Sequence, residues 1–143
     1  MKLSTRGRYG LRALVDLAAN AGEGTASLVQ TARRQKLSLN YLEQVFASLR
    51  RAGIVTTVKG AGGGYALAHD MDEITVKEVI EALEGEISIA DQAAGVREDE
   101  VQSAIRSLLW DEIDRQVEKL LAGRTLGSLV REYEYKRKKD DAG

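Results

Sequence analysis

A glycine-rich turn between two strand-like runs is the feature that most constrains the fold of this chain. Residues 54–58 (IVTTV) are β-branched throughout, residues 59–64 (KGAGGG) favour a turn, and residues 65–68 (YALA) form a second short run. Two such runs joined by a short glycine-containing loop are typical of a β-hairpin. Because the segments on either side have helical periodicity, we expect a mainly α fold with one small β-hairpin.

Three short helices are expected before the hairpin, over residues 5–21, 26–36 and about 40–52. In each segment apolar residues recur at three- and four-residue spacing. Three helices followed by a hairpin is the element order of a winged helix-turn-helix. The side chains expected to face the core are Leu11, Leu14, Val15, Leu17 and Ala18, then Leu28, Val29 and Ala32, then Leu42, Val45, Phe46 and Leu49.

The C-terminal half has a different organisation. A fourth helix is expected from Thr75 to about Leu83, then a loop, then a long helix over about residues 98–122, and then a short helix from Thr125. We expect the charged tail from Lys136 to be frayed. The predicted organisation is a winged helix-turn-helix over 1–85, a loop over 86–97, and a dimerisation helix with a short helix and tail over 98–143.

The long helix requires a partner surface. A preceding domain that has already used its own hydrophobic residues cannot cover the whole apolar stripe, so we expect a second copy of the chain to bury it. Packing of the whole stripe within one chain is the alternative. The residues expected at the dimer interface are Val101, Ile105, Leu108, Leu109, Ile113, Val117 and Leu120.

Charge is divided unequally between the two halves. Residues 1–70 carry ten Lys/Arg and four Asp/Glu, for a net charge of +6, whereas residues 71–143 carry eleven and eighteen, for −7. A basic half suits a polyanionic partner, so double-stranded DNA is the expected ligand. We expect phosphate contacts from Lys2, Arg6, Arg50 and Arg51, and we expect Tyr9 to be a further DNA-binding residue.

The third helix is the expected reading head, because in a helix-turn-helix the N-terminal residues of the second helix reach base edges in the major groove. Those residues here are Asn40, Tyr41, Glu43 and Gln44. Asn and Gln pair with adenine, and Glu accepts from cytosine. Ser38 and Asn40 are both candidate N-caps, and Asn40 with Glu43 resembles a capping box. The competing interpretation is that these are ordinary caps and exposed polar residues.

The hairpin tip carries a cation beside glycines. Lys59 and Gly60 begin a loop that can pass close to another chain, and a cation there suits a narrow minor groove. A phosphate loop of a nucleotide-binding enzyme is excluded, because these glycines join two strands and no Lys-Ser or Lys-Thr pair follows.

Enzymatic chemistry and metal binding find little support. The chain has no cysteine and one histidine, His69, which we expect in a surface turn. The absence of thiols excludes thiolate catalysis and cysteine-ligated zinc or iron–sulfur sites. Asp91, Glu98, Asp99 and Glu100 are expected in a solvated loop and helix start, and no metal site is predicted. No apolar run reaches the ~18 residues that span a bilayer, and no signal peptide is expected at the start, so we expect a cytoplasmic protein.

Several blocks together resemble one family. MKLSTRGRYGLRALVDLA, LSLNYLEQVFASLRRAGIV and VKGAGGGYALA, followed by ITVKEVIEALEGEIS, LLW and TLGSLV, resemble the Rrf-two-type family of winged-helix transcriptional regulators. The resemblance implies a homodimer with crossed long helices on a palindromic operator. It implies operator contacts at Ser38, Asn40, Tyr41, Glu43 and Gln44, with Lys59 in the minor groove. Family wings often carry Arg at that position, and Lys is costlier to desolvate.

This chain departs from the family at its cofactor site. Cluster-binding members place three cysteines between the fourth helix and the long helix, but residues 89–104 here contain neither cysteine nor histidine. Arg8 stands where some members have an extra carboxylate ligand. We therefore expect a cysteine-free member without a cysteine-ligated iron–sulfur cluster. Whether the ligands are naturally absent or were substituted stays open.

The sequence thus predicts a sequence-specific DNA-binding regulator, a repressor acting as a homodimer, and not an enzyme. The alternative is a winged-helix protein–protein interaction module that does not bind DNA, since fold alone does not fix function. Control by a regulatory protein partner and control by a small ligand at residues 86–97 both stay open.

Overall fold

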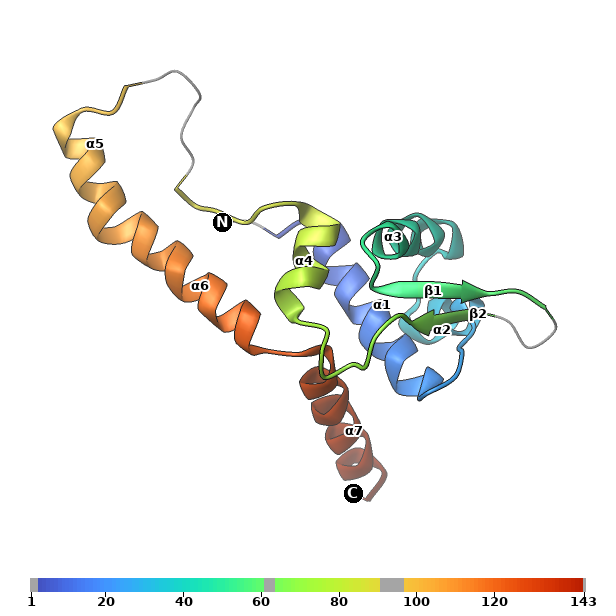
Figure 1. Ribbon diagram of the computed structural model, residues 1–143. Helices are drawn as coiled ribbons and strands as arrows, with labels where there is room; N and C mark the ends of the chain where they lie inside the picture. The colour runs from blue at the N-terminus through green and yellow to red at the C-terminus, as the bar shows by residue number, and fades with distance from the viewer. Residues whose placement is uncertain (1–2, 61–63, 91–96, 143) are drawn as a thin grey trace.

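The computed structural model describes residues 3–60, 64–90 and 97–142. Helices lie around a two-stranded ribbon, and one long rod, residues 100–123, extends away from them (Figure 1). Lys2, Ala61 and Asp91 lie outside the described residues. The elements in chain order are α1 (Thr5–Ala21), α2 (Leu28–Gln35), α3 (Leu39–Arg51), β1 (Val55–Val58), β2 (Gly64–Leu67), α4 (Val76–Glu84), α5 (Glu100–Ile105), the π-helical turn η1 (Arg106–Trp110), α6 (Asp111–Gly123) and α7 (Leu126–Ala142).

One hydrophobic core joins the first four helices to the start of α7. Leu14 and Leu17 of α1, Phe46 of α3, and Leu126 and Val130 of α7 all belong to it and are at most 2% exposed. The predicted core is confirmed for most positions. The prediction that Val29 faces the core is wrong, because its side chain is 41% exposed on the outer side of α2.

The ribbon is antiparallel, and both of its strands contact the core. Val55 pairs with Leu67, and Val58 pairs with Gly64. Tyr65 packs its ring edge-on against Phe46 at 5.2 Å between centroids, and it exchanges two backbone hydrogen bonds with Ala26. A Cβ at position 64 would lie 2.5 Å from the carbonyl oxygen of Ala26, so this close approach requires glycine.

The helix ends show where local sequence decided the structure. Ser38 caps α3, since its side chain accepts a hydrogen bond from the Tyr41 N–H at 3.2 Å, and Gly53 follows the helix with φ 77°. The expected cap at Asn40 is wrong, because Asn40 is already inside the helix. Thr75 caps α4 by accepting from the Glu78 N–H at 3.1 Å.

The long helix begins slightly later than expected and is not uniformly α-helical. Asp99 is its N-cap and forms a reciprocal capping box with Gln102. The five residues of η1 form a π-helical turn, in which the Asp111 N–H donates to the Arg106 carbonyl. Sequence periodicity predicted the helix but not this turn.

The frayed tail predicted from Lys136 is wrong. α7 runs for 17 residues to Ala142, so it is a long helix rather than a short one. Lys, Arg and Glu are good helix formers. Glu132 and Lys136 form an i,i+4 ion pair at 3.6 Å, and the Arg137 guanidinium lies 5.5 Å from the Tyr133 ring centroid. These local interactions favour continuation of the helix.

A short backbone bridge joins the end of the rod to the core. Thr75 and Thr125 form an isolated antiparallel bridge. On either side of it, the Val76 N–H donates to the Arg124 carbonyl at 2.9 Å and the Leu126 N–H donates to the Ile74 carbonyl at 2.8 Å. The turn from α6 into α7 is therefore hydrogen-bonded to the segment that starts α4. Among the described residues, no helix is long and apolar enough to cross a membrane.

A buried carboxylate joins α1 to α2. Asp16 is 2% exposed and accepts two hydrogen bonds from the Arg34 Nε and one from its Nη2, of which the shortest is 2.7 Å. The Gln35 side chain donates a further bond at 2.8 Å. Burying a carboxylate has a desolvation cost in free energy unless ion pairs and hydrogen bonds replace its contacts with water. Here all of these bonds come from the last turn of α2.

We expect Asp16→Ala to lower the free energy of unfolding by about 2–4 kcal/mol, because it removes this link and leaves polar groups of α2 without their partner. Urea denaturation measures the change. Glu23→Ala, at an exposed position after α1, is the matched control and is expected to stay within about 0.5 kcal/mol of the parent. Equal effects of the two substitutions would contradict a structural role for the Asp16 network.

Candidate nucleic-acid interface

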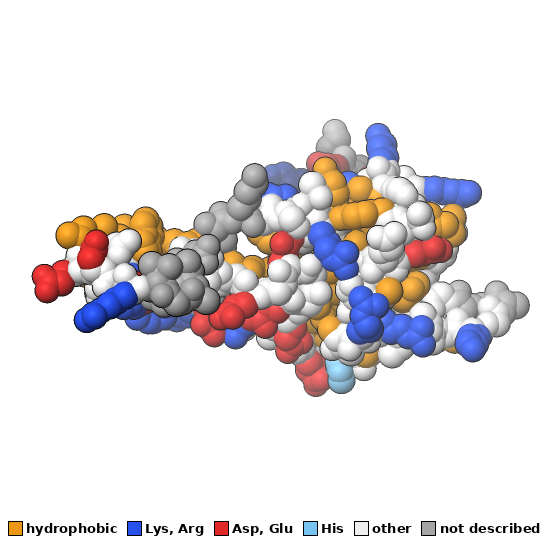
Figure 2. Space-filling view, turned by 90° about the horizontal axis from the view of Figure 1, so that it is seen from above, with side chains coloured by type: hydrophobic (Ala, Val, Ile, Leu, Met, Phe, Trp, Pro, Cys, Tyr) orange, Lys and Arg blue, Asp and Glu red, His pale blue; other side chains and the backbone are white. Residues whose placement is uncertain are grey.

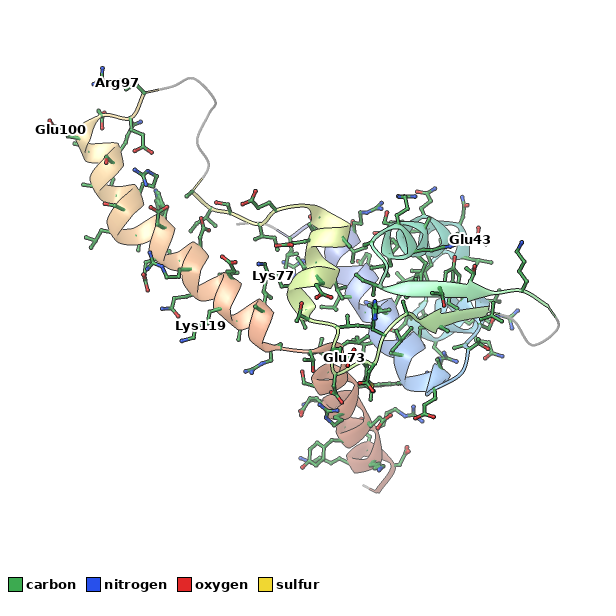
Figure 3. All side chains as sticks on the ribbon, viewed as in Figure 1. Glu43, Glu73, Lys77, Arg97, Glu100 and Lys119 are labelled. Atoms are coloured by element: carbon green, nitrogen blue, oxygen red, sulfur yellow. The ribbon has the colours of Figure 1, made fainter. Side chains whose placement is uncertain are left out.

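Helix α3 presents a polar face to solvent because its other face is fixed in the core. Leu42, Val45, Phe46 and Leu49 have no exposed surface. The side chains of Asn40, Glu43 and Gln44 are exposed on the same helix, and Figure 3 labels Glu43 there. Three of the predicted reading residues therefore lie together at the start of α3, available to a partner.

Tyr41 differs from these three. It is half-buried and packs against the core, and its hydroxyl is buried with no hydrogen-bond partner among the described residues. The hydroxyl is therefore turned away from the surface that Asn40, Glu43 and Gln44 share. The pattern of polar residues in the sequence did not distinguish Tyr41 from its neighbours.

Two guanidinium groups meet at one hydroxyl beside α3. Ser48 is 8% exposed, and its Oγ accepts a hydrogen bond from Arg6 of α1 and another, at 3.0 Å, from Arg51. Within the described part of the chain, neither guanidinium forms an ion pair with a carboxylate. Two cations held side by side without a counterion favour an anionic partner such as a phosphate.

Ser48 was not predicted as a functional residue. Nothing in its spacing distinguishes it from other small residues, since its role depends on Arg6, which lies 42 positions earlier. The structure brings the predicted phosphate-binding residues Arg6 and Arg51 together, and Arg50 is exposed on the same helix.

The ribbon carries the cation that was predicted at the hairpin tip. Lys59 is exposed directly after β1, and Gly60 follows it with φ 109°, a conformation that favours glycine. Tyr9 is 36% exposed on α1, with the Arg12 guanidinium 5.1 Å from its ring centroid. Lys2 lies outside the described residues. Figure 2 shows Lys and Arg side chains spread over the part of the molecule that bears α3 and the ribbon, with acidic side chains gathered mainly elsewhere.

The apolar stripe of the long rod is open to solvent. No residue of α5, η1 or α6 is buried, and Val101, Leu108 and Leu120 are 68%, 83% and 54% exposed. Ile105 and Leu109 are also exposed, whereas Ile113 and Val117 are half-buried on the part of the rod that packs beside α4. The alternative in which one chain covers the whole stripe is therefore wrong.

Polar contacts hold the rod to the segment that precedes it. Asp114 accepts hydrogen bonds from the Ile89 N–H at 2.8 Å, the Ser88 hydroxyl at 2.7 Å and the Ala90 N–H, and these lower the pKa of its carboxyl group. Arg106 donates to Glu98 at 2.7 Å and to Asp111 at 2.8 Å, and the pKa of its guanidinium is raised, mainly by the hydrogen bond that it donates to Glu98.

These residues do not fit an iron–sulfur cluster of the kind that the resemblance implies. Such a cluster is held by thiolates, and the chain contains no cysteine. In the described part of the segment, Glu98 is committed to Arg106 and Asp99 to its capping box. Over residues 3–60, 64–90 and 97–142, no three His, Asp or Glu side chains are grouped so that they could hold a metal ion. His69 is exposed, as expected.

Comparison with known proteins agrees with this geometry. The Rrf2 family, described as iron-dependent transcriptional regulators, matches residues 3–132. The transcriptional regulator CymR of Bacillus subtilis is 44% identical over 130 residues, covering 91% of this chain and 90% of the relative. IscR of Cereibacter sphaeroides is 41% identical over 136 residues, covering 92% and 88%.

Solved structures give the same result. The structure of CymR, the global cysteine regulator of B. subtilis, matches with a TM-score of 0.79 at 40% identity, covering 92% of this chain and 97% of that one. T. potens IscR matches with a TM-score of 0.75 at 36% identity, covering 95% and 90%. The chain is a winged helix-turn-helix protein and not an enzyme, and it belongs to the Rrf2 family of DNA-binding transcriptional regulators.

Proposed function

We propose that this protein is a repressor that binds a palindromic operator in the cytoplasm as a homodimer, without a cysteine-ligated cluster. The observation that carries the proposal is the exposed polar start of α3, held outward by a fully buried apolar face. A helix presented in this way fits the major groove, and a repressor acts by occupying the promoter.

Base reading is assigned to Asn40, Glu43 and Gln44. All three are exposed in the first turns of α3, and their side chains have the donors and acceptors that base edges require. Tyr41, with its buried hydroxyl, is assigned to packing of α3 rather than to reading. The Ser38 hydroxyl accepts from the Tyr41 N–H and still has its own proton to donate to a phosphate oxygen.

Backbone binding is assigned to Arg6, Arg50 and Arg51, and minor-groove binding to Lys59. The shared hydroxyl of Ser48 holds two of these guanidiniums at one point beside α3. Lys59 and Gly60 place a cation at the start of the ribbon tip. Phosphate contacts position a protein on DNA, whereas base contacts give it sequence preference.

Dimerisation is assigned to the stripe of the long rod. Large apolar side chains that lie together in water mark an interface, and Leu108 at 83% exposure is the most open of them. A two-fold pair of α3 helices would read two half-sites about 10–10.5 base pairs apart, or a multiple of that spacing. Selection from random duplex DNA tests the proposal, because it should enrich a palindrome. Recovery of unrelated sequences at low salt would exclude a specific operator.

We expect Gln44→Ala to weaken operator binding by about 1–3 kcal/mol and to relax the preference at one base position in each half-site. Arg50→Gln is the matched comparison, because it changes a side chain on the same helix that is assigned to phosphate. It should weaken all duplexes alike and reduce the slope of log affinity against log salt by about 0.9. Binding titrations on operator and mismatched duplexes at several salt concentrations measure both effects. If Gln44→Ala also weakened all duplexes equally, its base-reading role would be wrong.

We expect Leu108→Asp to raise the dissociation constant of the dimer by about 30-fold or more, because it places a charge in the centre of the apolar stripe. Sedimentation equilibrium measures the dimer dissociation constant. The same variant should lose more affinity for the full operator than for an isolated half-site. Lys119→Asp, on an exposed position of α6 (Figure 3), is the charge control and should leave the dimer intact. A parent chain that sediments as a monomer would exclude the homodimer.

A further inference from the structure

Helix α1 begins with backbone donors that its own cap residue does not satisfy. The first N–H groups of a helix have no partner within the helix, and the side chain of a serine N-cap normally accepts from one of them. Ser4 is the N-cap of α1, but its side chain forms no such bond. Its hydroxyl donates instead to the carboxylate of Glu84, which lies 80 positions later. The start of α1 therefore depends on a residue of another helix.

Glu84, the last residue of α4, takes the place of the missing cap. Its Oε1 accepts a hydrogen bond from the Gly7 N–H at 2.7 Å, in addition to the bond from the Ser4 hydroxyl. The first turn of α1 contains no acidic residue, whereas Arg6 and Arg8 place two cations there. Because the N-terminus of a helix is itself the positive end of the helix dipole, a carboxylate at this place offsets an unfavourable concentration of positive charge.

Two glycines of α1 allow the end of α4 to come this close. A Cβ at position 7 would lie 2.6 Å from the Glu84 Oε1, and a Cβ at position 10 would lie 2.6 Å from the Leu83 Cδ1. Gly7 and Gly10 are both buried. The end of α4 lies beside the start of α1 (Figure 1). The carboxylate is thus held at the first turn of α1 by the packing of the two helices as well as by its own hydrogen bonds.

Arg6 lies between the two residues that bind Glu84. Its guanidinium donates to the Ser48 Oγ, where it meets the guanidinium of Arg51. A guanidinium reaches one fixed point only when the backbone that carries it is fixed. A carboxylate that binds residues 4 and 7 also fixes the backbone of residue 6. Glu84 therefore controls the place of a cation with which, among the described residues, it forms no ion pair.

We propose that Glu84 is a positioning residue for DNA binding, which holds the first turn of α1 so that Arg6 meets Arg51 at Ser48 and presents its guanidinium to a phosphate. This role rests on the assignment of Arg6 to the DNA backbone proposed above. An acidic residue thereby strengthens binding to a polyanion. Electrostatics alone predicts the opposite, since a carboxylate close to a phosphate site repels DNA. The sign of the change in affinity on removal of Glu84 separates the two effects.

The test uses the full chain, titrated with labelled duplex DNA of mixed sequence at several salt concentrations. Arg6→Gln should weaken binding about tenfold and reduce the slope of log affinity against log salt by about 0.9 for each protomer bound. Glu84→Ala should weaken binding about fivefold or more and reduce the slope in the same direction, although it removes a negative charge. Glu81→Ala, which removes an exposed acid from the same helix, is the matched control and should bind as tightly as the parent or slightly more tightly.

Two further variants separate positioning from a general loss of stability. Gly7→Ala keeps the carboxylate in the chain but displaces it from the first turn of α1, and alanine favours a helix more than glycine does. It should therefore retain a higher urea unfolding midpoint than Glu84→Ala, yet weaken DNA binding in the same way. Glu84→Gln keeps an oxygen that can accept from the Gly7 N–H and the Ser4 hydroxyl, so its affinity should stay within about twofold of the parent.

The double variant Arg6→Gln with Glu84→Ala shows whether the effect passes through Arg6. Because coupled residues give non-additive losses, the double variant should bind no more weakly than Arg6→Gln alone. Additive losses, or a Glu84→Ala variant that binds DNA as tightly as the parent, would overturn the positioning role while leaving Arg6 as a phosphate contact. If Arg6→Gln itself changed neither the affinity nor the salt slope, the assignment of Arg6 to phosphate would be wrong, and the positioning role with it.

Discussion

The burial of one face of α3 is the constraint on which the function of this molecule depends. Four apolar side chains on that face have no exposed surface, so the helix cannot rotate without exposing them to water at a cost of about 1.5–3 kcal/mol each. The polar residues on the other face are therefore held outward by packing rather than by their own interactions. Asp16, through Arg34 and Gln35, fixes α2 against α1, and α2 in turn packs against α3.

Much of the fold could be predicted from the sequence, because its signals are local. The three- and four-residue spacing of apolar residues predicted α1 to α4, and the β-branched run with the glycine-rich turn predicted the ribbon. Errors arose where the outcome depends on distant residues or on competing local preferences. Val29 has the spacing of a core residue but lies on the outside of α2, and α7 continues through a charged tail because its residues favour a helix.

The candidate site could be predicted only in part, for the same reason. Asn40, Glu43 and Gln44 follow from their position on one helix. The convergence of Arg6 and Arg51 on Ser48 joins α1 to α3, and no spacing in the sequence indicates it. The buried hydroxyl of Tyr41 depends on how the whole core closes. Asp114 and Arg106 hold the segment before the rod by ordinary hydrogen bonds. The chain has no cysteine thiolates that could hold this segment instead.

The backbone bridge between Thr75 and Thr125 has a consequence for how a pair of such molecules measures DNA. Backbone hydrogen bonds at this bridge join the rod to the winged helix-turn-helix domain, so the connection is not a flexible linker. In a two-fold assembly held by the rods, the distance between the two reading helices would then be a rigid quantity, set by the angle at this joint. The dimer would therefore accept only one spacing between half-sites. If the half-sites of a promoter were shifted by a single base-pair step, the duplex would have to twist or bend for both of them to be bound.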